Sequence, residues 1–157
     1  MARFLTVAQR AVGIRGQVSV LLTTDDQIRR LNRTFRNIDK PTDVLSFPGV
    51  APFAGKERIA GDLAISFPTA RRQAGEHGHS PLVEIKILIL HGLLHLAGYD
   101  HHADSGQMEE RERMLRTRLK LPHGLIERAS GESARSRNGS NRSTRAAGKP
   151  GSKGRRA

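Results

Sequence analysis

The sequence predicts an α/β (α+β) fold: a small mixed sheet packed by helices, with a metal site at the end of a central helix. Two observations predict it. Segments with helical apolar spacing alternate with short runs of branched residues, which is the pattern of a single sheet layer covered by helices. A long apolar helix in the second half then ends in a group of histidines. The 157 residues show no internal repeat and suffice for one domain with an extension.

The expected order is helix, strand, helix, two strands and three helices. The first helix is predicted by four apolar residues at helical spacing, Phe4, Val7, Ala11 and Ile14. Branched and apolar runs predict three strands, at residues 18–22, 44–47 and 61–66. The second helix starts at the capping residue Thr24, ends before Asn37, and is expected to carry its apolar face on Ile28, Leu31 and Phe35.

Three helices are expected in the remainder of the domain. Pro68 precedes a short helix over residues 69–76. Ser80 caps the long apolar helix, and Pro81 occupies its first turn, where a missing N–H costs nothing. The last helix covers residues 105–119 and is expected to turn three apolar residues inward, Met108, Leu115 and Leu119.

The end of the long helix has the spacing of a metal centre. His91 and His95 are four residues apart and therefore share one helix face. Gly98 stands where a left-handed residue commonly ends a helix, so that His101 can return as a third nitrogen ligand. Three protein ligands with one open position are typical of a catalytic zinc site.

One position separates this motif from that of the metzincin peptidases, which read H-E-x-x-H-x-x-G-x-x-H. The glutamate that acts there as general base is Gly92 in this chain, which argues against peptide hydrolysis. A glycine inside a helix costs about 1 kcal/mol relative to alanine. Its presence therefore indicates a close approach of metal, substrate or neighbouring backbone.

Residues 31–48 are a second group of interest. Arg36 offers a planar fork of donors that suits a phosphate, and Asp43 and Ser46 flank a strand that could pass near the histidines. Composition alone favours a plainer interpretation, a surface turn with ordinary salt bridges.

Composition restricts the remaining possibilities. The absence of cysteine excludes disulfides and thiolate metal sites and fits a reducing cytoplasm. No apolar run reaches the ~18 residues that span a bilayer, and no signal peptide is recognisable, so a cytoplasmic protein without a membrane partner is expected.

Of the net charge of +12, +7 falls on residues 127–157. This basic segment has few large apolar residues and is expected to be a disordered tail, following a domain at residues 1–126, that attracts polyanions such as RNA.

The histidine motif, read as H-G-x-L-H-L-x-G-Y-D-H from His91 to His101, resembles the YbeY family of bacterial rRNA maturation endoribonucleases. The segment from Phe35 to Pro48 and the strand at 61–66 are similar to that family too, and the resemblance covers roughly residues 4–121. Family members usually begin with a strand upstream of the first helix. This chain starts at Met1, near that helix, so the strand is missing or the start is misassigned.

The resemblance implies a single-strand-specific, zinc-dependent endoribonuclease acting in 16S rRNA 3′-end maturation and ribosome quality control. It implies one Zn²⁺ per chain held by His91, His95 and His101, with Arg36 as the functional arginine. The implied partners are the 16S rRNA precursor, the small ribosomal subunit with one of its proteins, and an Era-type GTPase.

Several alternatives stay open at this point. Asp100 either orients the imidazole of His101 or caps the turn, and the nucleophile is either metal-activated water or the 2′-hydroxyl of the RNA. Rival functions are a non-catalytic RNA-binding assembly factor with a structural zinc and, less favoured, a zinc metallopeptidase. The histidines outside the motif are expected at the surface: His77, His79, His102 and His123.

Overall fold

The computed structural model describes residues 1–51, 54 and 57–123. The helices are α1 (Ala2–Val12), α2 (Asp25–Arg36), α3 (Phe67–His77), α4 (Pro81–Leu96) and α5 (Gln107–Arg118). The strands are β1 (Gln17–Thr23), β2 (Val44–Pro48) and β3 (Ile59–Ser66). The predicted basic tail at residues 127–157 lies outside the described residues.

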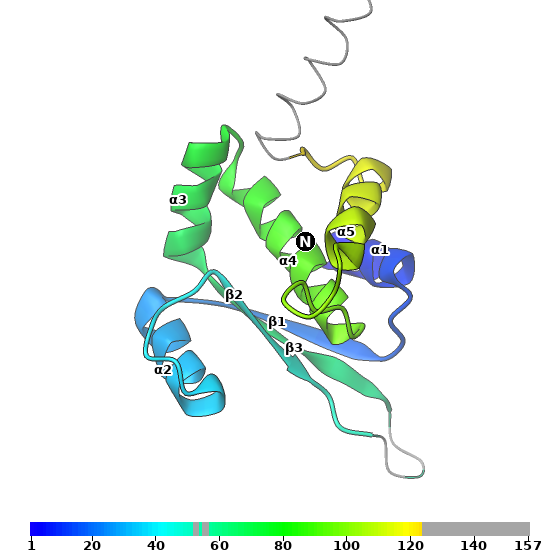
Figure 1. Cartoon of the computed structure of the whole chain (residues 1–157), viewed down its shortest axis with the longest axis horizontal. Coiled ribbons are helices and arrows are strands. Elements are labelled where there is room, and N and C mark those ends of the chain that lie inside the picture. Colours follow the sequence, from blue (N-terminus) through cyan, green and yellow to red (C-terminus); the bar gives the residue numbers. More distant parts are fainter. Residues whose placement is uncertain (52–53, 55–56, 124–157) are drawn as a thin grey trace, which may run out of the picture. The chain divides into compact units, whose positions relative to one another are not determined.

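The three strands form a mixed sheet in the order β1-β3-β2 (Figure 1). β1 runs parallel to β3, and β2 runs antiparallel to it. Ala64 of β3 stands between Leu21 of β1 and Leu45 of β2, which fixes the register across the sheet. The predicted fold class, a small mixed sheet packed by helices, is confirmed, and the order of elements is the expected one.

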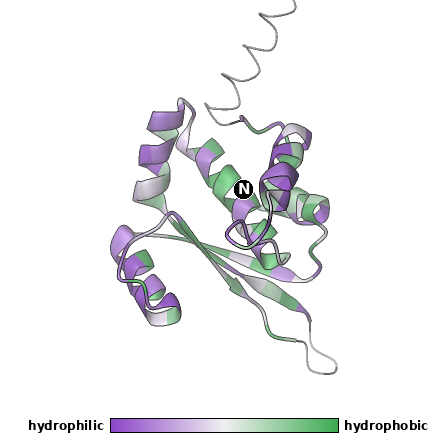
Figure 2. Ribbon diagram, in the orientation of Figure 1, coloured by the Kyte–Doolittle hydropathy of each residue, from purple (hydrophilic) through white to green (hydrophobic). Residues whose placement is uncertain are grey.

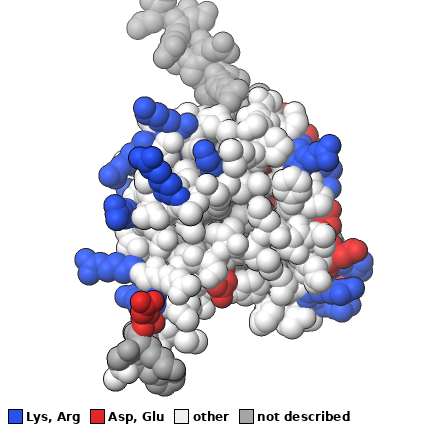
Figure 3. Space-filling view, turned by 180° about the vertical axis from the view of Figure 1, so that it is seen from behind, with Lys and Arg blue, Asp and Glu red and all other residues white. Residues whose placement is uncertain are grey.

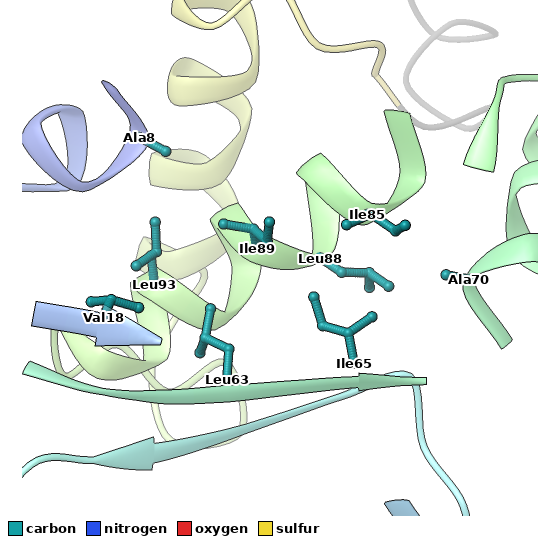
Figure 4. Close-up of a cluster of buried hydrophobic side chains, with 9 residues drawn as sticks. All are labelled: Ala8, Val18, Leu63, Ile65, Ala70, Ile85, Leu88, Ile89 and Leu93. Atoms are coloured by element: carbon teal, nitrogen blue, oxygen red, sulfur yellow. The ribbon is translucent and has the colours of Figure 1, made fainter. Parts of the chain in front are cut away.

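Helix α4 is the centre of the packing. In Figure 4 its side chains lie above Leu63 and Ile65 of the sheet; this cluster includes Ile85, Leu88, Ile89 and Leu93. On its other side α4 packs against α1 and α5 through a second cluster, which includes Ile87, Leu90, Leu94, Met108 and Leu115. Figure 2 shows α4 as the most hydrophobic helix, as expected for one that is buried on more than one face.

Helix α2 covers the opposite face of the sheet (Figure 1), where Ile28 packs on Leu45 and Ala64. The prediction that Phe35 belongs to this inner face is wrong, because its side chain is 65% exposed. It stands near the end of α2 and makes an edge contact with Phe47, at 5.1 Å between ring centroids.

The inner face of α1 also differs from the prediction. Val7 is exposed, whereas Ala8 and Ala11 are buried. Phe4 and Ala11 do pack against the core as predicted, so the inner face of α1 is shifted by one position at Val7. Ile14 follows the helix and still packs against the core.

One side of the sheet ends at β1, which pairs only with β3 among the described residues. Leu21 and Leu22 at this edge are 55% and 47% exposed.

Figure 3 shows lysine and arginine side chains at two sides of one face of the molecule and few charged atoms over its middle. In the described part of the chain, no helix is long and apolar enough to cross a membrane.

Candidate metal centre and cleft

The C-terminal end of α4 positions two of the three predicted ligands. His91 and His95 lie one turn apart on the helix, which ends at Leu96. The Tyr99 N–H donates to the Leu94 carbonyl at 3.1 Å, and Gly98 has a φ of +96°. The predicted left-handed turn at Gly98 is therefore confirmed. It reverses the chain and carries His101 back over the end of the helix.

The structure brings the three histidines together. The Nε2 atoms of His91 and His95 are 3.1 Å apart. The ring centroid of His101 lies 5.6 Å from that of His91 and 5.3 Å from that of His95. One ligand nitrogen from each ring lies within 4.8 Å of the others, so a single ion can contact all three.

The partners of the outer ring nitrogens select the tautomers that metal binding requires. His91 Nδ1 lies 2.8 Å from a carboxylate oxygen of Glu112, and His95 Nδ1 lies 3.0 Å from the Tyr99 carbonyl. Both partners are acceptors, so each Nδ1 carries the proton and donates it. The Nε2 lone pairs then point at the common centre, which is the arrangement of histidines that ligate a metal through Nε2. Three imidazole nitrogens with an open side fit zinc.

Glu112 is the residue of this site that the sequence did not reveal. It comes from α5, and its carboxylate also accepts from Arg116, at 2.5 and 3.0 Å. Burial raises the pKa of Glu112, but the hydrogen bond from His91 and the charge of Arg116 outweigh burial, and the net pKa is lowered. The carboxylate therefore stays charged and holds the His91 ring in place. Glu112 and Arg116 are four residues apart, a spacing that favours an ion pair on a helix. No such local spacing indicates the contact between Glu112 and His91.

The electrostatic environment favours neutral imidazole at His95. Burial lowers its pKa most, the neighbouring His91 and His101 lower it further, and the hydrogen bond to the Tyr99 carbonyl opposes them in part. The positive charge of Arg36 also lowers the pKa of His95. A neutral ring is the form that binds a metal.

The histidines open onto a cleft of about 710 Å³. Its wall is formed by residues of the 31–48 segment and by the turn after α4: Arg36, Thr42, Asp43, Val44, Ser46, Pro48, Gly98, Tyr99, Asp100 and His102. Arg36 is the last residue of α2, and its Nη2 donates to the Ser46 carbonyl at a long 3.5 Å. The segment is therefore more than a surface turn, although Arg29 and Asp39 do form an exposed salt bridge there at 2.8 Å.

Gly92 lets α4 approach the sheet. A Cβ at this position would stand 2.8 Å from Leu63 Cδ2 and 3.2 Å from Ser46 Oγ. The Ser46 hydroxyl donates to the Gly92 carbonyl at 3.2 Å. The sequence suggested that metal, substrate or neighbouring backbone approaches Gly92 closely. In the structure the close neighbours are side chains of the sheet, from Leu63 and Ser46.

Asp100 and His102 lie at the exposed rim. The Asp100 carboxylate accepts the His102 backbone N–H at 3.0 Å, which is the turn-capping arrangement. His102 is exposed, as expected, and its ring centroid is 3.9 Å from that of His101.

This geometry defines a class: small α/β proteins in which the end of a central helix and the turn after it present three convergent imidazoles to an arginine-bearing cleft. A sequence model described as "Endoribonuclease YbeY" matches residues 1–120. The chain belongs to that family, and the predicted membership in a family named for an RNA-cleaving hydrolase is confirmed.

Individual relatives agree. Endoribonuclease YbeY of Koribacter versatilis is 54% identical over 130 residues, covering 83% of this chain and 82% of that protein. The protein of the same name from Solibacter usitatus is 49% identical over 126 residues, covering 80% and 82%. The solution structure of TM1509 from Thermotoga maritima is similar with a TM-score of 0.50 and 25% identity, covering 92% of this chain and 93% of that one.

Proposed function

We propose that this chain is a zinc-dependent, single-strand-specific endoribonuclease that acts in 16S rRNA 3′-end maturation and ribosome quality control in the cytoplasm. One observation carries the proposal: three imidazoles, each with a ring nitrogen within 4.8 Å of the others, converge at a cleft that Arg36 also lines. Membership in the YbeY family supports RNA as the substrate. The small ribosomal subunit with one of its proteins and an Era-type GTPase are the proposed partners.

The site suits a phosphodiester because its ligands are neutral. His91, His95 and His101 would hold one Zn²⁺ without reducing its charge. Zinc bound there supplies Lewis acidity toward a phosphoryl oxygen and acidifies a water. Arg36 binds the non-bridging oxygens through its planar fork, and its long bond to Ser46 leaves most of its donors available. A positive site of this kind stabilises the charge that develops on phosphate in the transition state.

A metallopeptidase is less well supported. The position of the peptidase glutamate is Gly92, whose place is filled from the sheet side by Leu63 and Ser46. Of the two acidic residues that line the cleft, Asp43 already accepts from the Val44 N–H at 2.7 Å and from Gln73 at 3.1 Å. Asp100 accepts from the backbone of its own turn. No lining carboxylate is therefore placed as a dedicated general base.

The test combines metal content with cleavage. Wild type, His95→Ala and Arg36→Ala are purified in full length, and zinc is quantified beside cleavage of a single-stranded RNA and its duplex. We expect His95→Ala to lose zinc and cleavage together. Arg36→Ala should keep zinc and cut about 10²–10³-fold more slowly, the usual effect of removing one donor from a transition-state oxyanion. Arg30→Ala, exposed on the same helix, is the matched control and should behave as wild type.

The contrary result has a definite meaning. If all of these proteins cut RNA equally, the activity does not belong to this cleft. If His95→Ala loses zinc yet supports rRNA maturation in cells, the metal is structural. Either result would favour the non-catalytic assembly factor.

A further inference from the structure

A second cluster of metal-ligating side chains lies at the other end of α4. His77 is the last residue of α3, His79 follows one residue later, and Glu84 stands in the first turn of α4. One ligand atom from each lies within 4.8 Å of the others. These three residues are called the junction cluster here, because they lie where α3 passes into α4. None of the three lines the cleft at the three-histidine centre.

The turn between the helices brings both imidazoles to Glu84. Gly78 has a φ of +73°, and the His79 N–H donates to the Ala74 carbonyl at 3.0 Å, so the chain folds back on the end of α3. The expectation that both histidines lie at the surface is therefore wrong for His79, whose side chain is only 12% exposed. His77 is 45% exposed and leaves one side of the cluster open to solvent.

Glu84 gives the cluster its charge. Its side chain is 3% exposed, and a buried carboxylate is costly unless a positive partner compensates it. Both imidazoles approach the same oxygen, Oε2: His77 Nδ1 lies at 3.4 Å, and His79 Nε2 makes a close contact. Without a metal, each neutral imidazole can donate one N–H to this oxygen, although the contact from His77 is long. A divalent cation would engage all three groups.

We propose that the junction cluster binds a second divalent transition metal, of the kind that zinc and cobalt represent. Two imidazoles and one carboxylate are a ligand set that zinc accepts in proteins, and imidazole also suits other first-row divalent ions. The partial negative charge at the C-terminus of α3 favours a cation there, and the Glu84 carboxylate offsets the opposing dipole of the α4 N-terminus. The exposed His77 provides the entry path.

This site is distinct from the three-histidine centre. His91 follows Glu84 by seven positions along α4, which is about 10 Å along the axis at ~1.5 Å per residue. Both ions can therefore be bound at once without sharing a ligand. The ion at the junction cluster joins α3 to α4 and contributes to stability without contact with the RNA cleft.

The experiment counts metals on the full-length, metal-stripped protein. Zn²⁺ is titrated calorimetrically and Co²⁺ by its visible absorption into wild type, His77→Ala, His95→Ala and the double variant. We expect two equivalents for wild type, one for each single variant and none for the double variant. Metal should raise the melting temperature of His95→Ala but not of the double variant. His123→Ala removes a histidine outside both clusters, and we expect it to bind two equivalents.

Two results would overturn the proposal. Wild type could bind one equivalent, lost in His95→Ala and retained in His77→Ala. Alternatively, a second equivalent could persist in His77→Ala. In both cases His79 and Glu84 form a buried ion pair and nothing more. Because His77 is largely exposed, its variant should fold, and circular dichroism checks this independently of metal binding.

Discussion

A histidine cluster lies at each end of helix α4, and the carboxylate has a different position in each cluster. At the C-terminal end Glu112 stands behind His91, so the inward-facing ligand atoms are imidazole nitrogens alone, in a cleft that Arg36 also lines. At the N-terminal end Glu84 belongs to the cluster itself and is buried. Neutral ligands leave the full charge of an ion for an anionic substrate, whereas a carboxylate ligand neutralises part of it. The first end suits chemistry, and the second suits stability.

The largest expected effect tests the stability assigned to the junction cluster. Glu84→Ala removes the buried carboxylate and leaves two imidazoles without their common partner, so we expect a loss of about 3 kcal/mol of unfolding free energy even with chelator present. Urea unfolding measures it, and Glu76→Ala, an exposed glutamate of α3, is the control. A loss of less than about 1 kcal/mol would show that the buried charge is not compensated within this cluster.

The next effect concerns the carboxylate of the other end. Glu112→Gln weakens the acceptor that fixes the His91 tautomer, and we expect the affinity of the three-histidine centre for Zn²⁺ to fall about 10–100-fold. Competition with a fluorescent chelator gives the dissociation constant. Glu110→Gln, exposed on the same helix, should leave it unchanged. An unchanged affinity in Glu112→Gln would mean that the His91 ring is held by packing alone.

A smaller effect tests the contact between α4 and the sheet beside the histidines. Gly92→Ala should gain about 1 kcal/mol of helix propensity and lose about 1–3 kcal/mol through the clash with Leu63, a net loss of about 1 kcal/mol. Gly75→Ala in α3 meets nothing within 4 Å and should be stabilising. Thermal unfolding of both variants separates propensity from packing. Equal gains at the two positions would contradict the close approach at Gly92.

Asp25 belongs to neither histidine cluster, and its carboxylate gives the fold a pH dependence that can be compared with that of the two clusters. Hydrogen bonds from Ser66 and Thr69 lower the pKa of Asp25 most; burial opposes them, and Arg72 lowers it further. A lowered pKa stabilises the fold above the ordinary value of 3.8, and this stability is lost as the pH falls through the folded-state pKa. Asp25→Asn should therefore cost about 1 kcal/mol at pH 7, a low figure because the side chain is 33% exposed.

The check is a series of urea unfolding curves from neutral pH to below pH ~3. Wild type and Asp25→Asn should converge at the acid end, whereas the exposed neighbour Asp26→Asn should follow wild type throughout. A constant difference across the range would assign the effect of Asp25 to geometry and not to charge. As the pH falls, protonation of imidazoles is expected to release metal before Asp25 loses its charge, because the ordinary pKa of histidine is higher than that of aspartate.

The sequence predicted those parts of the molecule that depend on neighbours along the chain. Spacing placed His91 and His95 on one helix face, and Gly98 supplied the turn that returns His101. Branched runs located the strands, although β3 begins at Ile59, earlier than expected. These features arise from local periodicity and backbone preference, which a single sequence contains.

The remaining features depend on how the helices cross. Glu112 meets His91 from another helix, 21 residues along the chain, and no periodicity connects them. His79 faces Glu84 only because α3 and α4 meet at a left-handed glycine. Which face of α1 is buried likewise depends on tertiary packing: Ala8 is buried and Val7 is exposed, although apolar spacing favoured Val7.

The outer edge of β1 bears on how copies of this chain meet in solution. Its main-chain donors and acceptors have no neighbouring strand among the described residues, and Leu21 and Leu22 beside them are exposed. Such an edge is a template for pairing with another chain. A net charge of +12 makes two copies repel each other, but screening at physiological salt restricts that repulsion to about 8 Å. Salt, or a polyanion that neutralises the charge, would weaken this repulsion and leave the exposed edge of β1 accessible to a second chain.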